Sequence, residues 1–274
     1  MTPPTKMQPL EHLPVQVAQN LCALLTDIDD TLTLEGRLPA AAYTALERLS
    51  ESGIPVVPIT GRPAGWCDLI ARMWPVAGVV GENGAFYFTY DHKARRMTRR
   101  FMASEEERAS NRLRLTALAV QILEEVPGCA LSSDQPYRES DLAIDFCEDV
   151  PALPKAAVER ILELFGQAGA SAKVSSIHVN GWFGDFDKLS MTRIFLEEVL
   201  GVRLEDALEQ IVFCGDSPND APMFARFPHA CGVANVRDFA LEMPALPAYV
   251  SSACGGAGFV QIAERILELR ALGL

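Results

Sequence analysis

Short apolar runs recur along this chain, and most are followed by a segment with helical periodicity. The runs cover residues 21–25, 54–59, 76–80, 211–213 and 249–250, and the helical segments cover 40–50, 64–73, 189–200, 221–226 and 260–272. Such alternation is typical of a doubly wound parallel sheet, in which ligands bind at the carboxyl ends of the strands. The sequence therefore predicts an α/β core whose functional residues follow the strands.

The regular alternation breaks down between residues 84 and 185. A hairpin is expected over 86–101, a long helix over 104–125, and then two strand-like segments with a helix over 154–165 between them. A chain of 274 residues is long enough for two unequal domains. We therefore predict an N-terminal loose arm over 1–20, a core over 21–84 and 186–274, and an inserted α+β cap over 85–185.

Composition excludes several classes of function. The formal net charge of −12 would repel nucleic acids, and the short basic stretch 93–100 is expected on a solvated hairpin face. No apolar stretch is long enough to cross a membrane, and residues 1–20 contain no secretory signal. The seven scattered cysteines form no C-x-x-C motif, which favours a reducing cytoplasm over a disulfide framework or a zinc site. No sequence signal indicates an oligomeric state.

The first apolar run ends in three acids, Asp27, Asp29 and Asp30. Ionised carboxylates are costly to bury unless charges or hydrogen bonds compensate them, so this strand end is expected to meet a cation or a substrate. A D-x-D-x-T segment also forms Asx-turns and helix N-caps, and by itself it leaves that alternative open.

Three further segments place polar groups near strand ends or helix starts. They are PITGRP with Thr60 and Gly61, GDFDKLS with Lys188, and IVFCGDSPND with Asp216, Asn219 and Asp220. Each alone could be a turn, a helix cap or a solvated lysine. Together they supply the acids, hydroxyl and cation that phosphoryl transfer requires. A carboxylate can be the nucleophile through an aspartyl-phosphate, and an all-oxygen site suits Mg²⁺.

In these motifs, DIDDT, PITGR, DK and GDSPND in that order, the chain resembles the haloacid dehalogenase superfamily of phosphohydrolases. The resemblance covers nearly all of the chain after residue 20. It implies that Asp27 is the nucleophile and Asp29 the general acid/base. It also implies that Thr60, Gly61 and Lys188 hold the transferring phosphate.

The same resemblance implies a Mg²⁺ site made by Asp27, Asp216 and the backbone carbonyl of Asp29. Asn219 and Asp220 would orient the metal and Lys188. Dehalogenases and phosphonate-cleaving members resemble this chain without an acid at position 29, and ion-pumping relatives have threonine there. The resemblance therefore implies a phosphatase or a phosphomutase.

The segment GENGA at 81–85 resembles the branch with a large α/β cap, which includes Cof-type, sucrose-phosphate, trehalose-phosphate and mannosyl-3-phosphoglycerate phosphatases and phosphomannomutase. Asp30, in place of the glycine common in Cof-type motifs, favours the sugar phosphatases. The expected function is Mg²⁺-dependent hydrolysis of a small phosphorylated metabolite, such as a sugar phosphate. A phosphosugar mutase and a catalytically idle phospho-ligand-binding module are the alternatives.

Substrate choice in that branch comes from the cap and from the loop at 81–85. The candidate substrate residues are Glu82, Asn83, Arg138, Glu139, Ser140, Ser176, His178 and Asn180. Arg138 and Glu139 could instead form an exposed pair worth less than about 1 kcal/mol. His178 alternates with apolar neighbours, which also fits the solvent face of a half-buried strand.

Overall fold

The largest described sheet of the protein is parallel throughout and is built from segments predicted as the core, together with one strand from the predicted N-terminal arm. The computed structural model describes residues 6–175 and 177–272. The strands are β1 (Gln8–Pro9), β13 (Tyr249–Val250), β12 (Cys231–Gly232), β11 (Ile211–Gly215), β2 (Ala23–Thr26) and β3 (Val56–Pro58), in that spatial order. Every neighbouring pair is parallel. This confirms the predicted α/β fold class.

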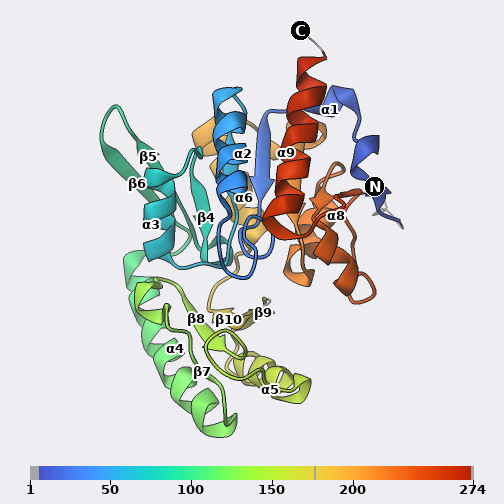
Figure 1. The fold of residues 1–274 in the computed structure, drawn as a ribbon. Coiled ribbons are helices and arrows are strands. Elements are labelled where there is room, and N and C mark those ends of the chain that lie inside the picture. The colour runs from blue at the N-terminus through green and yellow to red at the C-terminus, as the bar shows by residue number, and fades with distance from the viewer. Residues whose placement is uncertain (1–5, 176, 273–274) are drawn as a thin grey trace.

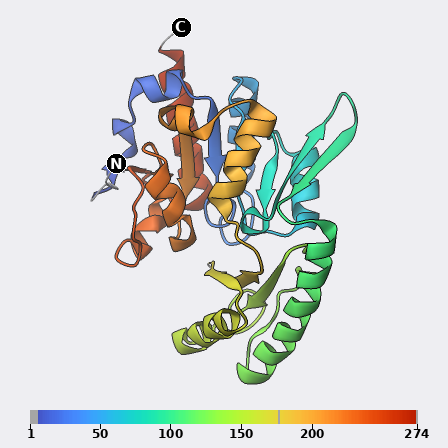
Figure 2. The ribbon, with the colours of Figure 1, turned by 180° about the vertical axis from the view of Figure 1, so that it is seen from behind.

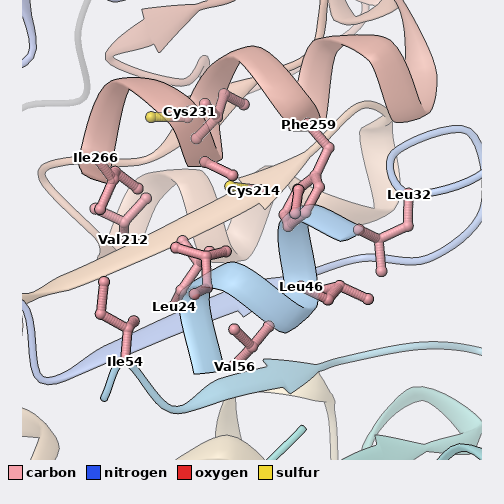
Figure 3. Close-up of a cluster of buried hydrophobic side chains, with 14 of the residues drawn as sticks. Leu24, Leu32, Leu46, Ile54, Val56, Val212, Cys214, Cys231, Phe259 and Ile266 are labelled. Carbon is pink, nitrogen blue, oxygen red and sulfur yellow. The ribbon is translucent and has the colours of Figure 1, made fainter. Parts of the chain in front are cut away.

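Helices cover both faces of this sheet (Figures 1 and 2). They include α2 (Ala40–Glu51), α3 (Ala64–Met73), α6 (Lys188–Leu200), α8 (Ala221–Arg226) and α9 (Gly255–Ala271). Successive side chains of a strand point to opposite faces. Leu24 of β2 therefore packs in a cluster with Leu46 of α2 and Phe259 of α9 (Figure 3), while Leu25 packs in a second cluster with Phe195 of α6.

A three-stranded antiparallel sheet continues the core sheet at the β3 edge. A parallel bridge between Ile59 and Val80 connects the core sheet to β4 (Val79–Gly81), which pairs with β5 (Phe86–Asp91), and β5 pairs with β6 (Arg96–Phe101). The predicted hairpin is thus confirmed. It pairs with β4 and not with the strands of the smaller domain, although it lies within the range predicted for the cap.

The smaller domain has its own antiparallel sheet, in the order β7-β8-β10-β9. Its elements are α4 (Glu105–Glu125), β7 (Ala130–Leu131), β8 (Asp141–Asp145), α5 (Lys155–Gln167), β9 (Ser171–Val174) and β10 (His178–Trp182). Ser104 begins α4 with a capping box to Glu107. The two helices pack on the far face of the sheet, so that the sheet lies between them and the core (Figures 1 and 2).

The N-terminal segment is not loose in its described part, residues 6–20. Strand β1 pairs with β13, and α1 (Val15–Gln19) packs against α9. Leu10, Leu13 and Val17 are buried, because this segment covers apolar surface that the core sheet and α9 would otherwise expose.

Short elements complete the described chain. They are η1 (Leu10–His12), η2 (Glu82–Gly84), η3 (Gln135–Tyr137), α7 (Leu204–Ala207), η4 (Leu208–Gln210), η5 (Pro218–Asp220) and η6 (Ala234–Phe239). Among the described residues, none of the helices combines the length and apolar character that crossing a bilayer requires.

Candidate active site

The polar groups of the four predicted motifs meet at the carboxyl edge of the parallel sheet. Asp27 follows β2, Thr60 follows β3, and Asp216 follows β11. Lys188 is the first residue of α6, which Asp187 caps. These strands are neighbours and run in the same direction, so residues far apart in the sequence lie side by side at this edge.

Lys188 is at the centre of a buried charge cluster. Its Nζ lies 2.9 Å from Oδ1 of Asp27 and 2.9 Å from Oδ1 of Asp220. Burial would lower the pKa of Lys188, but Asp220 and Asp27 together raise it above its ordinary value, which keeps the ammonium charged. Burial raises the pKa of Asp27 to about 7, and the charge of Lys188 opposes this shift.

Negative charge exceeds positive charge in this cluster. Asp27, Asp216 and Asp220 are buried, and each offers a carboxylate oxygen within 4.8 Å of the others. Oγ1 of Thr31 donates to Oδ1 of Asp216 at 3.0 Å, and Nδ2 of Asn235 donates to Oδ2 at 3.1 Å. Burial and then the charges of Asp220 and Asp27 raise the pKa of Asp216 well above its ordinary value. Three buried carboxylates around one ammonium favour another cation, and their oxygen ligands suit Mg²⁺.

Asp220 differs from the other two acids because its carboxylate connects Lys188 to backbone N–H groups. Oδ1 accepts from Lys188, and Oδ2 accepts from the backbone N–H groups of Asp216 at 3.1 Å and Ser217 at 3.4 Å. This geometry fits the predicted role of orienting Lys188. Asn219 was predicted for a similar role, but in the described structure it forms no hydrogen bond with Lys188; its Oδ1 accepts from Oγ of Ser217 at 2.8 Å.

Arg62 holds the side chain of Asp29. Its Nε lies 3.0 and 3.1 Å from the two carboxylate oxygens of Asp29, and its Nη2 lies 2.8 Å from Oδ1. The same guanidinium reaches Oε1 of Glu148 in the smaller domain at 3.4 Å. Arg62 also lies over the ring of Trp66, 4.4 Å from its centroid. Because the fork of an arginine fixes a carboxylate in a plane, the predicted general acid has a defined orientation that also involves the smaller domain.

A cavity between the core and the smaller domain, here called the active-site cavity, joins these groups. Its lining consists of Asp27, Asp29, Gly61, Arg62, Asn83, Ser217 and Asn219 from the core and Arg138, Lys173, Ser175, Ile177, His178 and Asn180 from the smaller domain. Four predicted substrate residues are therefore among the lining residues. Thr60 lies behind the lining, where its Oγ1 accepts the backbone N–H of Arg62 at 3.0 Å.

Arg138 does not form an exposed pair with Glu139, so that alternative is wrong. Its side chain is only 1% exposed and lies 2.9 Å from Oδ1 of Asp134 and 3.0 Å from Oδ1 of Asp141. Asn180 donates to Oδ2 of Asp141 at 3.0 Å. Burial opposes the charged form of Arg138, but Asp141, Asp134 and Glu82 hold its pKa above the ordinary value. Arg138 is thus a fixed cation at one wall of the active-site cavity.

The alternation of His178 with apolar residues allowed a position on the solvent face of a strand, but His178 does not lie on such a face. It is buried at the cavity, and its Nε2 lies 2.8 Å from Oε2 of Glu148. The core covers this face of the smaller sheet, which the sequence pattern had assigned to solvent. Glu148 therefore lies between His178 and Arg62.

The other predicted substrate residues are not among the lining residues. Glu82 is buried and bonded to backbone N–H groups, Glu139 pairs on the surface with Arg112 at 3.1 Å, and Ser140 donates its own N–H to Glu82. Ser176 lies outside the described residues. Glu82 and Glu139 lie close to the cavity along the chain, but other partners engage their side chains.

Sequence reasoning missed several residues of the site. Asn235 comes shortly after strand β12, just as the other site residues follow their strands. The strand has only two residues, however, and is too short to be recognised from the sequence. Arg62 lies within PITGRP but was given no role. Glu148 and Lys173 had no local signal at all, because only the packing of the smaller domain on the core brings them to the site.

Comparisons with known proteins agree with this geometry. The family model of haloacid dehalogenase-like hydrolases matches residues 24–118. The phosphoglycolate phosphatase of Methanothermobacter thermautotrophicus is 26% identical over 251 residues, which is 89% of this chain and 98% of that protein.

Solved structures show the same fold. Protein 0175 of Thermoplasma acidophilum superposes with a TM-score of 0.69 at 18% identity, over 91% of this chain and 99% of that one. The sucrose-phosphatase of Synechocystis, solved with sucrose and phosphate, superposes with a TM-score of 0.61 at 14% identity, over 90% of this chain and 98% of that one.

The fold and the site show a parallel-sheet core with an acidic edge and a second domain over it. Residues 24–118 match the haloacid dehalogenase-like hydrolases, and over 89% of its length the chain is similar to a phosphatase, which agrees with the enzyme class that the motifs predicted.

Proposed function

We propose that this protein is a Mg²⁺-dependent phosphomonoesterase that acts on a small phosphorylated metabolite through an aspartyl-phosphate at Asp27. The observation that supports this most strongly is the position of the Asp27 carboxylate, 2.9 Å from the Lys188 ammonium and on the lining that also contains Asp29. A nucleophile, a cation and an acid then surround one point in the cavity.

In the first step, an oxygen of Asp27 forms a bond to phosphorus while the bond from phosphorus to the leaving oxygen breaks. Lys188, with Thr60 and Gly61, would hold the equatorial oxygens during this displacement. Asp27, Asp216 and the backbone carbonyl of Asp29 would hold Mg²⁺. When bound there, Mg²⁺ would neutralise the charge of the phosphate and of the acids around it.

Asp29 would give its proton to the leaving oxygen and then take a proton from the water that attacks phosphorus in the second step. Water attack breaks the bond between phosphorus and Asp27 and releases inorganic phosphate. Arg62 holds Asp29 in the orientation found here, and Glu148 extends that contact to the smaller domain. We therefore propose that this domain acts as a cap that limits water during the first step.

The proposed substrate is a sugar phosphate, in line with the resemblance to the large-cap branch. One observation favours a second candidate, a phosphorylated acid. Lys173 lies on the lining, and within 6–175 and 177–272 its side chain has no hydrogen-bond or ion-pair partner. An unpaired cation on the lining would favour a substrate carboxylate, and the relative from Methanothermobacter is a phosphoglycolate phosphatase.

Phosphate release tests the function directly. The purified protein is given glucose 6-phosphate, phosphoglycolate, and 2-hydroxyethyl phosphate, which is the analogue of phosphoglycolate without the carboxylate. Each is tested with Mg²⁺ and with a chelator. Asp27→Asn is the blank and should release no phosphate while folding normally. Full activity of this variant would refute the role of Asp27.

The pattern of release then identifies the substrate class. Preference for phosphoglycolate over 2-hydroxyethyl phosphate that disappears in Lys173→Met would support an acidic substrate, and preference for glucose 6-phosphate would support a sugar phosphate. Dependence on a sugar bisphosphate without net phosphate release would indicate the mutase. Tight binding of these esters by folded protein without turnover would indicate the idle binding module.

We also propose a cytoplasmic location and no nucleic-acid partner. Among the described residues, six cysteines are free thiols, which fits a reducing compartment: Cys22, Cys67, Cys129, Cys214, Cys231 and Cys254. The net charge of −12 disfavours binding to phosphate backbones.

A further inference from the structure

Glu82 is a buried carboxylate whose hydrogen bonds connect the two domains. Its Oε1 accepts from the backbone N–H of Ala64 at 3.0 Å and of Glu139 at 2.9 Å. Its Oε2 accepts from Ser140 at 2.6 Å and Asp141 at 3.2 Å. The side chain has no exposed surface. A carboxylate offers about four lone-pair directions, so these four donors use its full capacity.

The donors come from both sides of the active-site cavity. Ala64 is the first residue of α3 in the core, where helix N–H groups lack partners within the helix. The segment 139–141 enters β8 of the smaller domain and presents three successive N–H groups. Leaving such donors unpaired in a buried place is unfavourable. The carboxylate therefore favours a single placement of segment 139–141 on the core.

A second hydrogen bond between the domains is made by a side chain of the smaller domain. Nη1 of Arg138 donates to the backbone oxygen of Gly61 at 3.0 Å. The same nitrogen contacts Asp141, which accepts from Asn180. Arg138, Asn180 and Gly61 all line the active-site cavity. The placement of segment 138–141 therefore also sets the distance between the wall of the smaller domain and the predicted phosphate-binding loop.

The backbone around Glu82 is joined to that loop as well. The N–H of Glu82 donates to the carbonyl of Arg62 at 3.2 Å, and the N–H of Asn83 donates to the carbonyl of Thr60 at 3.0 Å. Glu82 and Asn83 both have positive φ, at 43° and 55°, which non-glycine residues adopt only when their surroundings require it. The loop is thus held in an unfavourable backbone conformation that directs the Glu82 carboxylate between α3 and segment 139–141.

We propose that Glu82 is a positioning residue that anchors segment 139–141 of the smaller domain to the phosphate-binding loop. It acts on catalysis through Arg138 and Asn180, without contacting the substrate itself. Its effect on turnover rests on the phosphatase function proposed above, whereas its effect on the two domains does not. This assigns a role to the acid of the GENGA segment, which the sequence predicted as a substrate contact.

Amide hydrogen exchange tests the anchor without any assay of activity. Because one carboxylate holds four amides, those of Ala64, Glu139, Ser140 and Asp141 should be protected together in the wild-type protein. In Glu82→Gln they should exchange about 10- to 100-fold faster, since an amide cannot accept from all four donors. Free exchange at 139–141 in the wild type, or unchanged exchange in the variant, would overturn the anchor.

Kinetics separate a positioning role from general damage. Burial raises the pKa of the Glu82 carboxyl to about 8, so the comparison is made at about pH 9, where the carboxylate is ionised. In Glu82→Gln, kcat/KM should fall about 10- to 100-fold for phosphoglycolate or glucose 6-phosphate, whichever the wild type hydrolyses faster. Hydrolysis of acetyl phosphate should change less than about threefold, because its small leaving group needs neither a proton nor contact with the smaller domain.

Glu139→Gln is the matched control. The side chain of this neighbouring acid is 42% exposed, and among the described residues its ion pair is with Arg112 alone. Glu139 contributes to the anchor through its backbone N–H, so the variant should match the wild type in both measurements. Equal losses on all substrates in Glu82→Gln, or none, would overturn the positioning role. Absence of any phosphatase activity in the wild type would refute the proposed function, and the exchange data would still decide the anchor.

Discussion

Replacement of Lys188 by methionine removes the only positive charge that the described structure places between Asp27 and Asp220. Methionine is of similar length and keeps the packing, so the change acts mainly on charge. Loss of one partner from a buried ion pair costs about 3–5 kcal/mol. Lys188 lies 2.9 Å from both carboxylates, and both are left uncompensated. We expect the free energy of unfolding to fall by about that amount when Mg²⁺ is absent.

The same variant should lose turnover by about a thousandfold or more. Removal of one group that stabilises charge in the transition state costs about 10²–10³ in kcat, and Lys188 in addition holds the nucleophile. Urea unfolding with a chelator measures the first effect, and Mg²⁺-dependent phosphate release measures the second. Lys155→Met is the control, because Lys155 is exposed at the start of α5 and its loss should change stability by less than about 0.5 kcal/mol.

Two results would refute this reasoning. Turnover by Lys188→Met above about a tenth of the wild-type rate would mean that the ammonium does not act on the transferring phosphate. A loss of stability no larger than that of Lys155→Met would mean that the buried acids are neutral in the metal-free protein. In that case the cluster would not require the cation that we propose.

Three further predictions concern the metal, the loop at 81–85 and acid stability. Mg²⁺ at about a hundred times its Kd should raise Tm by about 5 °C in a thermal scan, and Asp216→Asn should abolish this shift. Gly84→Ala should cost about 3 kcal/mol in urea unfolding and reduce turnover, because φ is +106° and a Cβ would lie 2.0 Å from the carbonyl oxygen of Asp187, next to α6. Gly201→Ala, at φ +67° with no atom near the new Cβ, should cost only about 1 kcal/mol and leave activity unchanged. A hydrogen bond from His178, aided by the charge of Arg62, lowers the pKa of Glu148 below its ordinary 4.5. Its contribution to stability is therefore present above that value and is lost as the pH falls through the lowered one. The urea midpoints of Glu148→Gln and the wild type should differ at neutral pH and converge once the pH is below the lowered pKa. A pH-independent difference would contradict this.

Much of the core could be predicted from the sequence. The apolar runs are buried on both faces of the sheet. For that reason, parallel strands appear in the sequence as short continuous apolar runs. Asp27, Thr60 and Asp216 follow such runs, and the rule that carboxyl ends of parallel strands share one edge was sufficient to bring them together. The helices α2, α3 and α8 begin at the predicted residues, because their periodicity and the prolines before two of them are local signals.

The short strands could not be predicted in the same way. β1 and β12 each contain two residues, too few for any periodicity, and they form because neighbouring strands supply the partners for their backbone groups. The assignment of the hairpin 86–101 to the cap depended on its position in the sequence. Its pairing with β4 is a matter of register between strands, which the hairpin's own sequence does not encode.

By itself the sequence determined the class of fold, the acidic edge and the chemistry that the edge can perform, because each depends on residues within one strand, loop or helix. Tertiary structure alone decided how the second domain meets that edge. Arg62 and Glu148 are 86 residues apart, and Glu82 and Glu139 are 57 apart. Periodicity shows which face of an element is buried, but not which distant element covers it, so contacts of this kind are determined only when the whole chain has packed.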